Sequence, residues 1–88
     1  MYRISIDNYF KRAYKKLDSA VQKDFQNKIK IFMQNPFQPQ LHTHQLLGRH
    51  KGKWTFYLRA GYRVWFYFQE PNHIILVDIA SHDKYKKR

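Results

Sequence analysis

The sequence predicts an α+β domain, in which a hairpin of two helices packs on one face of a small antiparallel sheet. Three patterns predict it: apolar residues alternate with polar ones at the start of the chain, recur every three or four positions over the next two segments, and alternate again over most of the second half. The expected order of elements is β-α-α-β-β-β. A chain of 88 residues has the length of one domain, so residues 1–88 are expected to form a single domain.

A strand is expected at the start of the chain. Tyr2, Ile4 and Ile6 alternate with polar residues, which is the period of a strand with one buried side. Asp7 and Asn8 come next, and side chains of these two types cap the first turn of a helix by accepting a backbone N–H. The first strand is therefore expected to lead directly into a helix.

Two amphipathic helices are expected next. Over residues 10–17 and again over residues 21–32, apolar residues recur every three or four positions, so one side of each helix can be buried. Ser19, with Gln22 three residues later, matches a capping box that would begin the second helix. Pro36 is expected to end that helix, because the residue before a proline avoids the helical conformation. Few residues separate the two segments, so they are expected to pair as a hairpin.

The second half of the chain is expected to form the rest of the sheet. Residues 36–53 contain two Pro, two Gly and three His, and are expected to be loop with some extended structure. Alternation then predicts strands over residues 54–59, 62–69 and 74–79, with a tight turn at Gly61 between the first two. The face of the sheet away from the helices would carry polar and basic side chains of the central strands.

The chain is strongly basic. Lys and Arg number 17 and Asp and Glu number 6, which gives a formal net charge of +11. Five basic residues and no acidic residue lie in the stretch from Arg49 to Arg63. Charge of one sign repels itself and a polyanion relieves that repulsion, so a nucleic acid or an acidic protein is the expected partner. A membrane surface fits less well, because the basic residues are not confined to one amphipathic helix.

The composition excludes several classes of site. The chain has no Cys, which excludes a disulfide framework, a thiolate metal site and a cysteine nucleophile. Its longest aliphatic run, Ile74–Val77, is too short to cross a membrane, and no secretory signal is visible, so a cytoplasmic protein is expected. His42, His44 and His50 lie close together without an acidic residue or Cys among them, so no metal or other cofactor is expected.

Four stretches of the sequence resemble the RelE/ParE toxin superfamily of bacterial toxin–antitoxin modules. They are LHTHQLLG at 41–48, GKWTF at 52–56, YRVWF at 62–66 and VDIASHD at 77–83. The resemblance covers essentially the whole chain, and its His-containing stretches are more similar to the mRNA interferase branch (the RelE, YafQ and YoeB types) than to the gyrase-poisoning ParE branch. It implies a RelE-like fold and ribosome-dependent cleavage of mRNA, held in check by a cognate antitoxin. The toxin would be a monomer or part of a toxin–antitoxin hetero-oligomer, in contact with mRNA and ribosomal RNA.

The chemistry implied by the resemblance needs no metal, because the ribose 2′-hydroxyl of RNA can attack the adjacent phosphate. One group must take the hydroxyl proton, a cation must stabilise the charge on the phosphorane, and a donor must protonate the leaving 5′-oxygen. The resemblance implies that Arg63 grips the scissile phosphate, that His82 is the general acid, and that His44 or a neighbouring group is the base. Tyr85 lies three residues after His82 rather than the four that the family often has, and would stack on a base or assist the proton step.

The basic stretch itself is expected to bind the substrate through phosphates, without reading base sequence. Its expected substrate-binding residues are Arg49, His50, Lys51, Lys53 and Arg59. A plain alternative for such a run is a solvated surface, and for Arg63 an ion pair with Asp78 or Asp83.

Two rival functions use the same fold. One is a ParE-like poison of DNA gyrase, which would damage DNA and leave mRNA intact. The other is a non-catalytic basic RNA-binding module, in which replacing Arg63 or His82 would leave the toxicity of the protein unchanged. A fold alone does not choose among the three.

Overall fold

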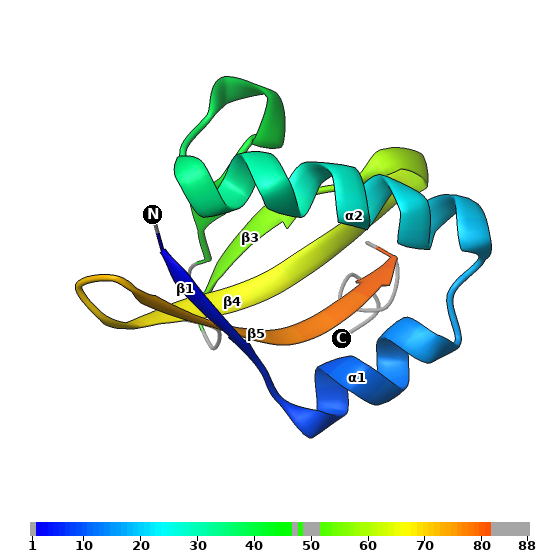
Figure 1. Ribbon diagram of the computed structural model, residues 1–88, viewed down its shortest axis with the longest axis horizontal. Helices are drawn as coiled ribbons and strands as arrows, with labels where there is room; N and C mark the ends of the chain where they lie inside the picture. The colour runs from blue at the N-terminus through cyan, green and yellow to red at the C-terminus, as the bar shows by residue number, and fades with distance from the viewer. Residues whose placement is uncertain (1, 47, 49–51, 82–88) are drawn as a thin grey trace.

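The computed structural model describes residues 2–46, 48 and 52–81 of the chain (Figure 1). The order of elements along the chain confirms the predicted β-α-α-β-β-β arrangement, with one very short extra strand, β2, inside the stretch expected to be loop with some extended structure. The elements are β1 (Arg3–Ile6), α1 (Asn8–Lys15), α2 (Ser19–Gln34), a 3-10 turn (Pro39–Leu41), β2 (His44–Gln45), β3 (Trp54–Tyr57), a second 3-10 turn (Arg59–Gly61), β4 (Tyr62–Glu70) and β5 (His73–Ser81).

The five strands form one sheet in the order β1-β5-β4-β3-β2. The pairs β2–β3, β3–β4 and β4–β5 are antiparallel, but β1 is parallel to β5. The sheet is therefore mixed rather than purely antiparallel. The physical reason is long-range: β1 belongs to no hairpin, and it pairs with the last strand only after the whole chain between them has folded back.

Both helices begin at an aspartate side chain. Asp7 caps α1 as predicted, since its carboxylate accepts the backbone N–H of Phe10 at 2.8 Å. The expectation that Ser19 and Gln22 form a capping box is wrong, because Asp18 is the N-cap of α2 and Ser19 is the first helical residue. Gln22 instead donates its side-chain amide to the carbonyl of Tyr14 at 2.8 Å. That bond ties the end of α1 to the start of α2.

The two helices form the predicted hairpin and diverge from their short connection, α1 along β5 and α2 across the other strands (Figure 1). The ring of Tyr14 lies edge-on to Phe25 with centroids 5.4 Å apart, which packs the two helices together where they meet. Asn35 leaves the helical conformation just before Pro36 and ends α2, as predicted.

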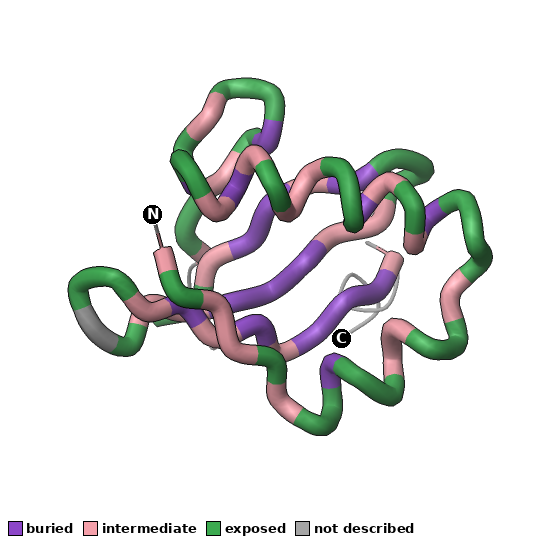
Figure 2. The backbone as a smooth tube through the Cα atoms, viewed as in Figure 1, coloured by how far each residue is buried: buried purple, intermediate pink, exposed green. Residues whose placement is uncertain are grey.

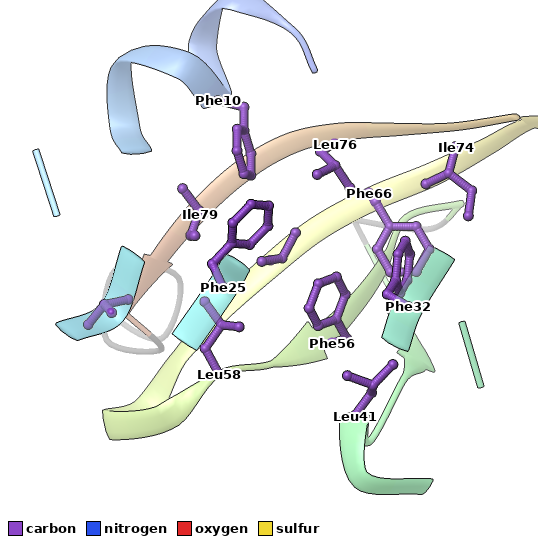
Figure 3. Packing of buried hydrophobic residues seen from close by; sticks show 12 residues of the cluster. Phe10, Phe25, Phe32, Leu41, Phe56, Leu58, Phe66, Ile74, Leu76 and Ile79 are labelled. Carbon is purple, nitrogen blue, oxygen red and sulfur yellow. The ribbon is translucent and has the colours of Figure 1, made fainter. Parts of the chain in front are cut away.

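The core lies between the helix pair and one face of the sheet. Figure 2 shows the central strands buried along most of their length and the helices buried on one side only. Phe32 of α2 stacks on Phe56 of β3 at 4.5 Å and lies edge-on to Phe66 of β4 at 4.9 Å (Figure 3). All three rings are fully buried, so the C-terminal end of α2 is fixed over β3 and β4.

The β3–β4 hairpin closes through a tight turn. Ala60 and Gly61 both have positive φ, 58° and 76° respectively. The tight turn predicted at Gly61 is confirmed, and the left-handed conformation costs glycine little. None of the helices in the described part of the chain has the length and apolar character needed to span a membrane.

Candidate functional site

The candidate site lies on the outer face, by which we mean the face of the sheet away from the helices. Because Phe56 and Val64 point into the core, their neighbours along β3 and β4 point outward. The strand register places Tyr57 opposite Arg63 and Thr55 opposite Trp65 on this outer face. Arg63, the residue expected to grip a phosphate, therefore lies at one end of a row of outward-facing side chains.

Arg63 packs on an aromatic ring. Its guanidinium carbon lies 4.3 Å from the centroid of the Tyr57 ring, a cation–π contact. Both residues are half-buried. The contact restricts the orientation of the guanidinium and leaves its edges open to hydrogen-bond an anion. A guanidinium can donate to two phosphate oxygens at once.

His44 reaches the same ring from the neighbouring strand β2. Its imidazole lies edge-on to Tyr57 with centroids 5.6 Å apart, and the ring of His42 lies 5.5 Å away on the same tyrosine. We call these four residues, Arg63, Tyr57, His44 and His42, the Tyr57 cluster. Two residues that the sequence marked for catalysis, Arg63 and His44, thus contact one shared ring.

The hydrogen bond of His44 fixes which of its nitrogens can accept a proton. Its Nδ1 lies 3.0 Å from the backbone carbonyl oxygen of His42. A carbonyl only accepts, so Nδ1 carries the hydrogen and donates it. In the neutral ring, Nε2 then bears the lone pair, and His44 presents a proton acceptor to the exposed surface.

The backbone at His42 helps to create this geometry. His42 follows the 3-10 turn at Pro39–Leu41 in the left-handed conformation, with φ of 53°. The left-handed step turns the chain sharply into β2 and brings its carbonyl to the His44 ring. Few non-glycine residues adopt this region, and those that do are concentrated at functional sites.

Thr55 lies in the middle of the outer face, between His44 of β2 and Trp65 of β4. It is fully buried, and its hydroxyl has no hydrogen-bond partner among the described residues. A buried hydroxyl without a partner costs about 1–3 kcal/mol.

The outer face is less open than a bare solvated sheet. Trp65 and Asp78 are both almost fully buried there, at 4% and 3% exposure. The indole of Trp65 is therefore packed against its neighbours and is not open for a base to stack on. Asp78 accepts the backbone N–H of Ile79 at 2.8 Å, whereas the contact that orients Arg63 is with Tyr57.

The remaining predicted site residues fall into two groups. Lys53 and Arg59 lie in the described part of the chain, where both are exposed, but they are far from each other. Lys53 precedes β3 at the end remote from Arg63. Arg59 lies in the β3–β4 turn, where its backbone N–H donates to the carboxylate of Asp24 in α2 at 2.8 Å. The others lie outside the described residues and stay predictions; they are Arg49, His50, Lys51, His82 and Tyr85.

Sequence reasoning missed Tyr57. The signal was present, since Tyr57 and Arg63 are equally distant from Ala60 and therefore face each other across a hairpin that turns there. No group of three or more His, Cys, Asp or Glu among the described residues could hold a metal ion. The Tyr57 cluster therefore offers a guanidinium, two imidazoles and a phenol for chemistry.

Known structures share this architecture along nearly the whole chain. YafQ from E. coli strain BL21(DE3) matches with a TM-score of 0.79 at 10% identity, over 97% of this chain and 98% of that one. A YoeB/ParE toxin from Agrobacterium tumefaciens matches with a TM-score of 0.75 at 14% identity, over 91% and 98%. The E. coli RelBE toxin–antitoxin complex contains a chain that matches with a TM-score of 0.70 at 17% identity, over 92% and 96%.

No protein-family model and no curated protein sequence matches the chain. The structural matches show that the chain has the RelE/ParE toxin fold. They confirm, at the level of the fold, the resemblance that the four sequence stretches indicated.

Proposed function

We propose that this protein is the toxin of a type II toxin–antitoxin module, and that it inhibits translation in the cytoplasm by cutting mRNA on the ribosome. The single observation that carries the proposal is the Tyr57 cluster, in which Arg63 and the proton-accepting His44 are held against one ring. A fold shared with RelE, YafQ and YoeB toxins supports it. The strong positive charge of the chain, +11, suits a ribosomal RNA surface.

In the proposed reaction, the ribose 2′-hydroxyl attacks the adjacent phosphate and the bond to the 5′-oxygen breaks. His44 accepts the hydroxyl proton at Nε2, a step that contributes about 10²–10⁴-fold when the base is well placed. Arg63 donates to the phosphorane oxygens and stabilises the charge that develops on them. His82 protonates the leaving oxygen and Tyr85 assists; both residues lie outside the described part of the chain.

A cognate antitoxin would restrain this activity. The E. coli RelBE relative was crystallised as a toxin–antitoxin complex. On this chain, an apolar groove of about 300 Å³ lies at the junction of β1, α1 and α2, with Ile6, Phe10 and Phe25 in its lining and Lys11 and Lys15 along it. An amphipathic segment with an apolar side and acidic flanks complements both the groove and its two cations.

The test is expression in bacteria with mapping of mRNA 5′ ends. Wild-type protein should stop growth and produce new ends inside translated frames. Arg63→Ala and His44→Gln should remove those ends, whereas Arg12→Ala, at an exposed cation on α1, should leave them. Growth arrest with intact messages and trapped gyrase would refute mRNA cleavage and support the gyrase-poison alternative. Toxicity unchanged in both site variants would support a non-catalytic module.

A further inference from the structure

A hollow lies on the helix side of the sheet, between α1 and the place where β4 begins and β5 ends. Its volume is about 370 Å³, at the lower end of the range of small-molecule sites. Tyr62 of β4 pairs with Ser81 of β5 there, and α1 packs beside β5 (Figure 1). We call it the Ala13 hollow, and its lining includes Arg12, Ala13, Lys16, Leu17, Ile79 and Ala80.

The small side chain of Ala13 leaves this space open. Tyr9, Ala13 and Leu17 are spaced by four residues along α1 and the turn that follows it, so they lie on one side of the helix. Tyr9 and Leu17 are large, whereas Ala13 between them has only a methyl group. The floor of the hollow is apolar, because Ile79 and Ala80 line it and are only 1% and 9% exposed.

Two cations border the apolar floor. Arg12 lies in the last turn of α1 and Lys16 is the C-cap, so the two side chains are one helical turn apart, with Cβ atoms about 5–6 Å from each other. Both residues are exposed, and neither forms an ion pair with a described residue. One anionic group can therefore contact both side chains, and the guanidinium of Arg12 suits a carboxylate in particular.

We propose that the Ala13 hollow binds a small amphiphilic carboxylate, meaning an organic acid in which one ring or a short alkyl chain bears a single carboxylate. The apolar body lies over Ala13, and the carboxylate bridges Arg12 and Lys16. The site is separate from the Tyr57 cluster. Tyr62 directly precedes Arg63 on β4, so these two side chains point to opposite faces of the sheet.

Charge and size favour this occupant over three others. Residues 82–88, which follow Ser81, contain four Lys or Arg and one Asp, so their charge opposes that of the hollow. A nucleic acid supplies negative charge, but its phosphates and riboses are polar and do not match an apolar floor. An acidic protein segment supplies both kinds of group, but a hollow of about 370 Å³ is small for a run of residues.

The experiment is an NMR titration of the purified full chain, without RNA, at fixed pH and ionic strength. The probes are 3-phenylpropionate, its neutral analogue 3-phenylpropan-1-ol, and acetate, which has the charge without the apolar body. Amide shifts at Ala80 and Ser81 should report binding. We expect 3-phenylpropionate to bind at least about fivefold tighter than the alcohol, because of two exposed ion pairs, and at least about tenfold tighter than acetate, because of the buried ring.

Each comparison can overturn the proposal. Equal binding of the acid and the alcohol would show that the two cations do not contact the ligand. Equal binding of the acid and acetate would show that the apolar floor is not used. A poly-glutamate peptide that displaces 3-phenylpropionate at an equal concentration of carboxylate would assign the hollow to an acidic protein segment instead.

Ala13→Leu tests the place of binding. The larger side chain fills the hollow without changing the charge, so the shifts at Ala80 and Ser81 should disappear, while thermal unfolding shows that the variant is folded. Undiminished binding by this folded variant would place the ligand outside the hollow and contradict the proposal.

A double variant tests the two cations and remains informative if Ala13→Leu does not fold. Arg12→Gln combined with Lys16→Gln should lower the affinity for 3-phenylpropionate to that for the alcohol. The matched control combines Lys11→Gln with Lys15→Gln, a pair with the same spacing on α1 that lines the apolar groove at the junction of β1, α1 and α2. An equal loss in the control would show that the acid responds to net charge alone. Because no RNA is present, failure of this binding and failure of mRNA cutting are separate results.

Discussion

Tyr57 gives the sharpest test of how the site is organised, because its ring touches both groups assigned to the reaction. Replacing Tyr57 by Leu removes the surface on which Arg63 lies at 4.3 Å and against which His44 packs at 5.6 Å. The cation–π contact at such a partly exposed position is worth about 0.5–1 kcal/mol. The effect on the free energy of unfolding should therefore be small.

The effect on activity should be much larger than the effect on stability. Without the ring, neither the guanidinium nor the imidazole keeps its orientation, and a misplacement of about 1 Å can cost about 100-fold in rate. We expect Tyr57→Leu to lower ribosome-dependent mRNA cleavage by about two orders of magnitude. Tyr57→Phe keeps the ring and removes only the hydroxyl, so we expect it to remain close to wild type.

The assay is primer extension on a defined message in a purified translation reaction, with thermal unfolding of each variant measured in parallel. If Tyr57→Leu cuts as fast as wild type, the ring does not organise the site. If Tyr57→Phe loses as much activity as Tyr57→Leu, the hydroxyl and not the ring is what matters, and the reasoning from packing is refuted.

Three further predictions follow from single contacts. His44→Gln should slow cleavage about 10²–10⁴-fold, while His42→Gln should keep most activity, because His42 orients the imidazole through its backbone carbonyl; equal losses in the same primer-extension assay would contradict this. Asp18→Ala should lower the free energy of unfolding by about 1 kcal/mol and Ser19→Ala by clearly less, as measured by urea denaturation, and the reverse order would show that Ser19 is the cap. Lys15→Glu should weaken antitoxin binding in calorimetry without altering cleavage; unchanged affinity would remove the apolar groove as the docking site.

The local patterns of the sequence were sufficient to predict the helices and most of the strands, but not to predict which strands pair over long distances in the chain. Alternation identified the strands from Trp54 onward, and the apolar spacing identified both helices, because each pattern records which side of an element is buried. The parallel pairing of β1 with β5 cannot be recognised from such a pattern, since side chains alternate between the two faces of a sheet in parallel and antiparallel strands alike. The cap was also ambiguous, because Asp18 and Ser19 are adjacent residues of equal capping ability.

The candidate site was half predictable for related reasons. Arg63 and His44 were found by their residue types and by resemblance, but that they share Tyr57 depends on the exact register of β2, β3 and β4. Asp78 could not be placed on the outer face, because one extra residue in β5 reverses the alternation beyond it. Register and bulges are set by the packed sheet as a whole, so the alternation within one strand does not reveal them.

Attack by the 2′-hydroxyl is the central claim, and one substitution in the substrate tests it directly. A message is prepared with a single 2′-deoxynucleotide on the 5′ side of the mapped cut and offered to the protein on the ribosome. Cleavage at that position should disappear while cuts at unmodified positions continue. Continued cleavage at the deoxynucleotide would contradict it, because no hydroxyl would be present there for His44 to activate.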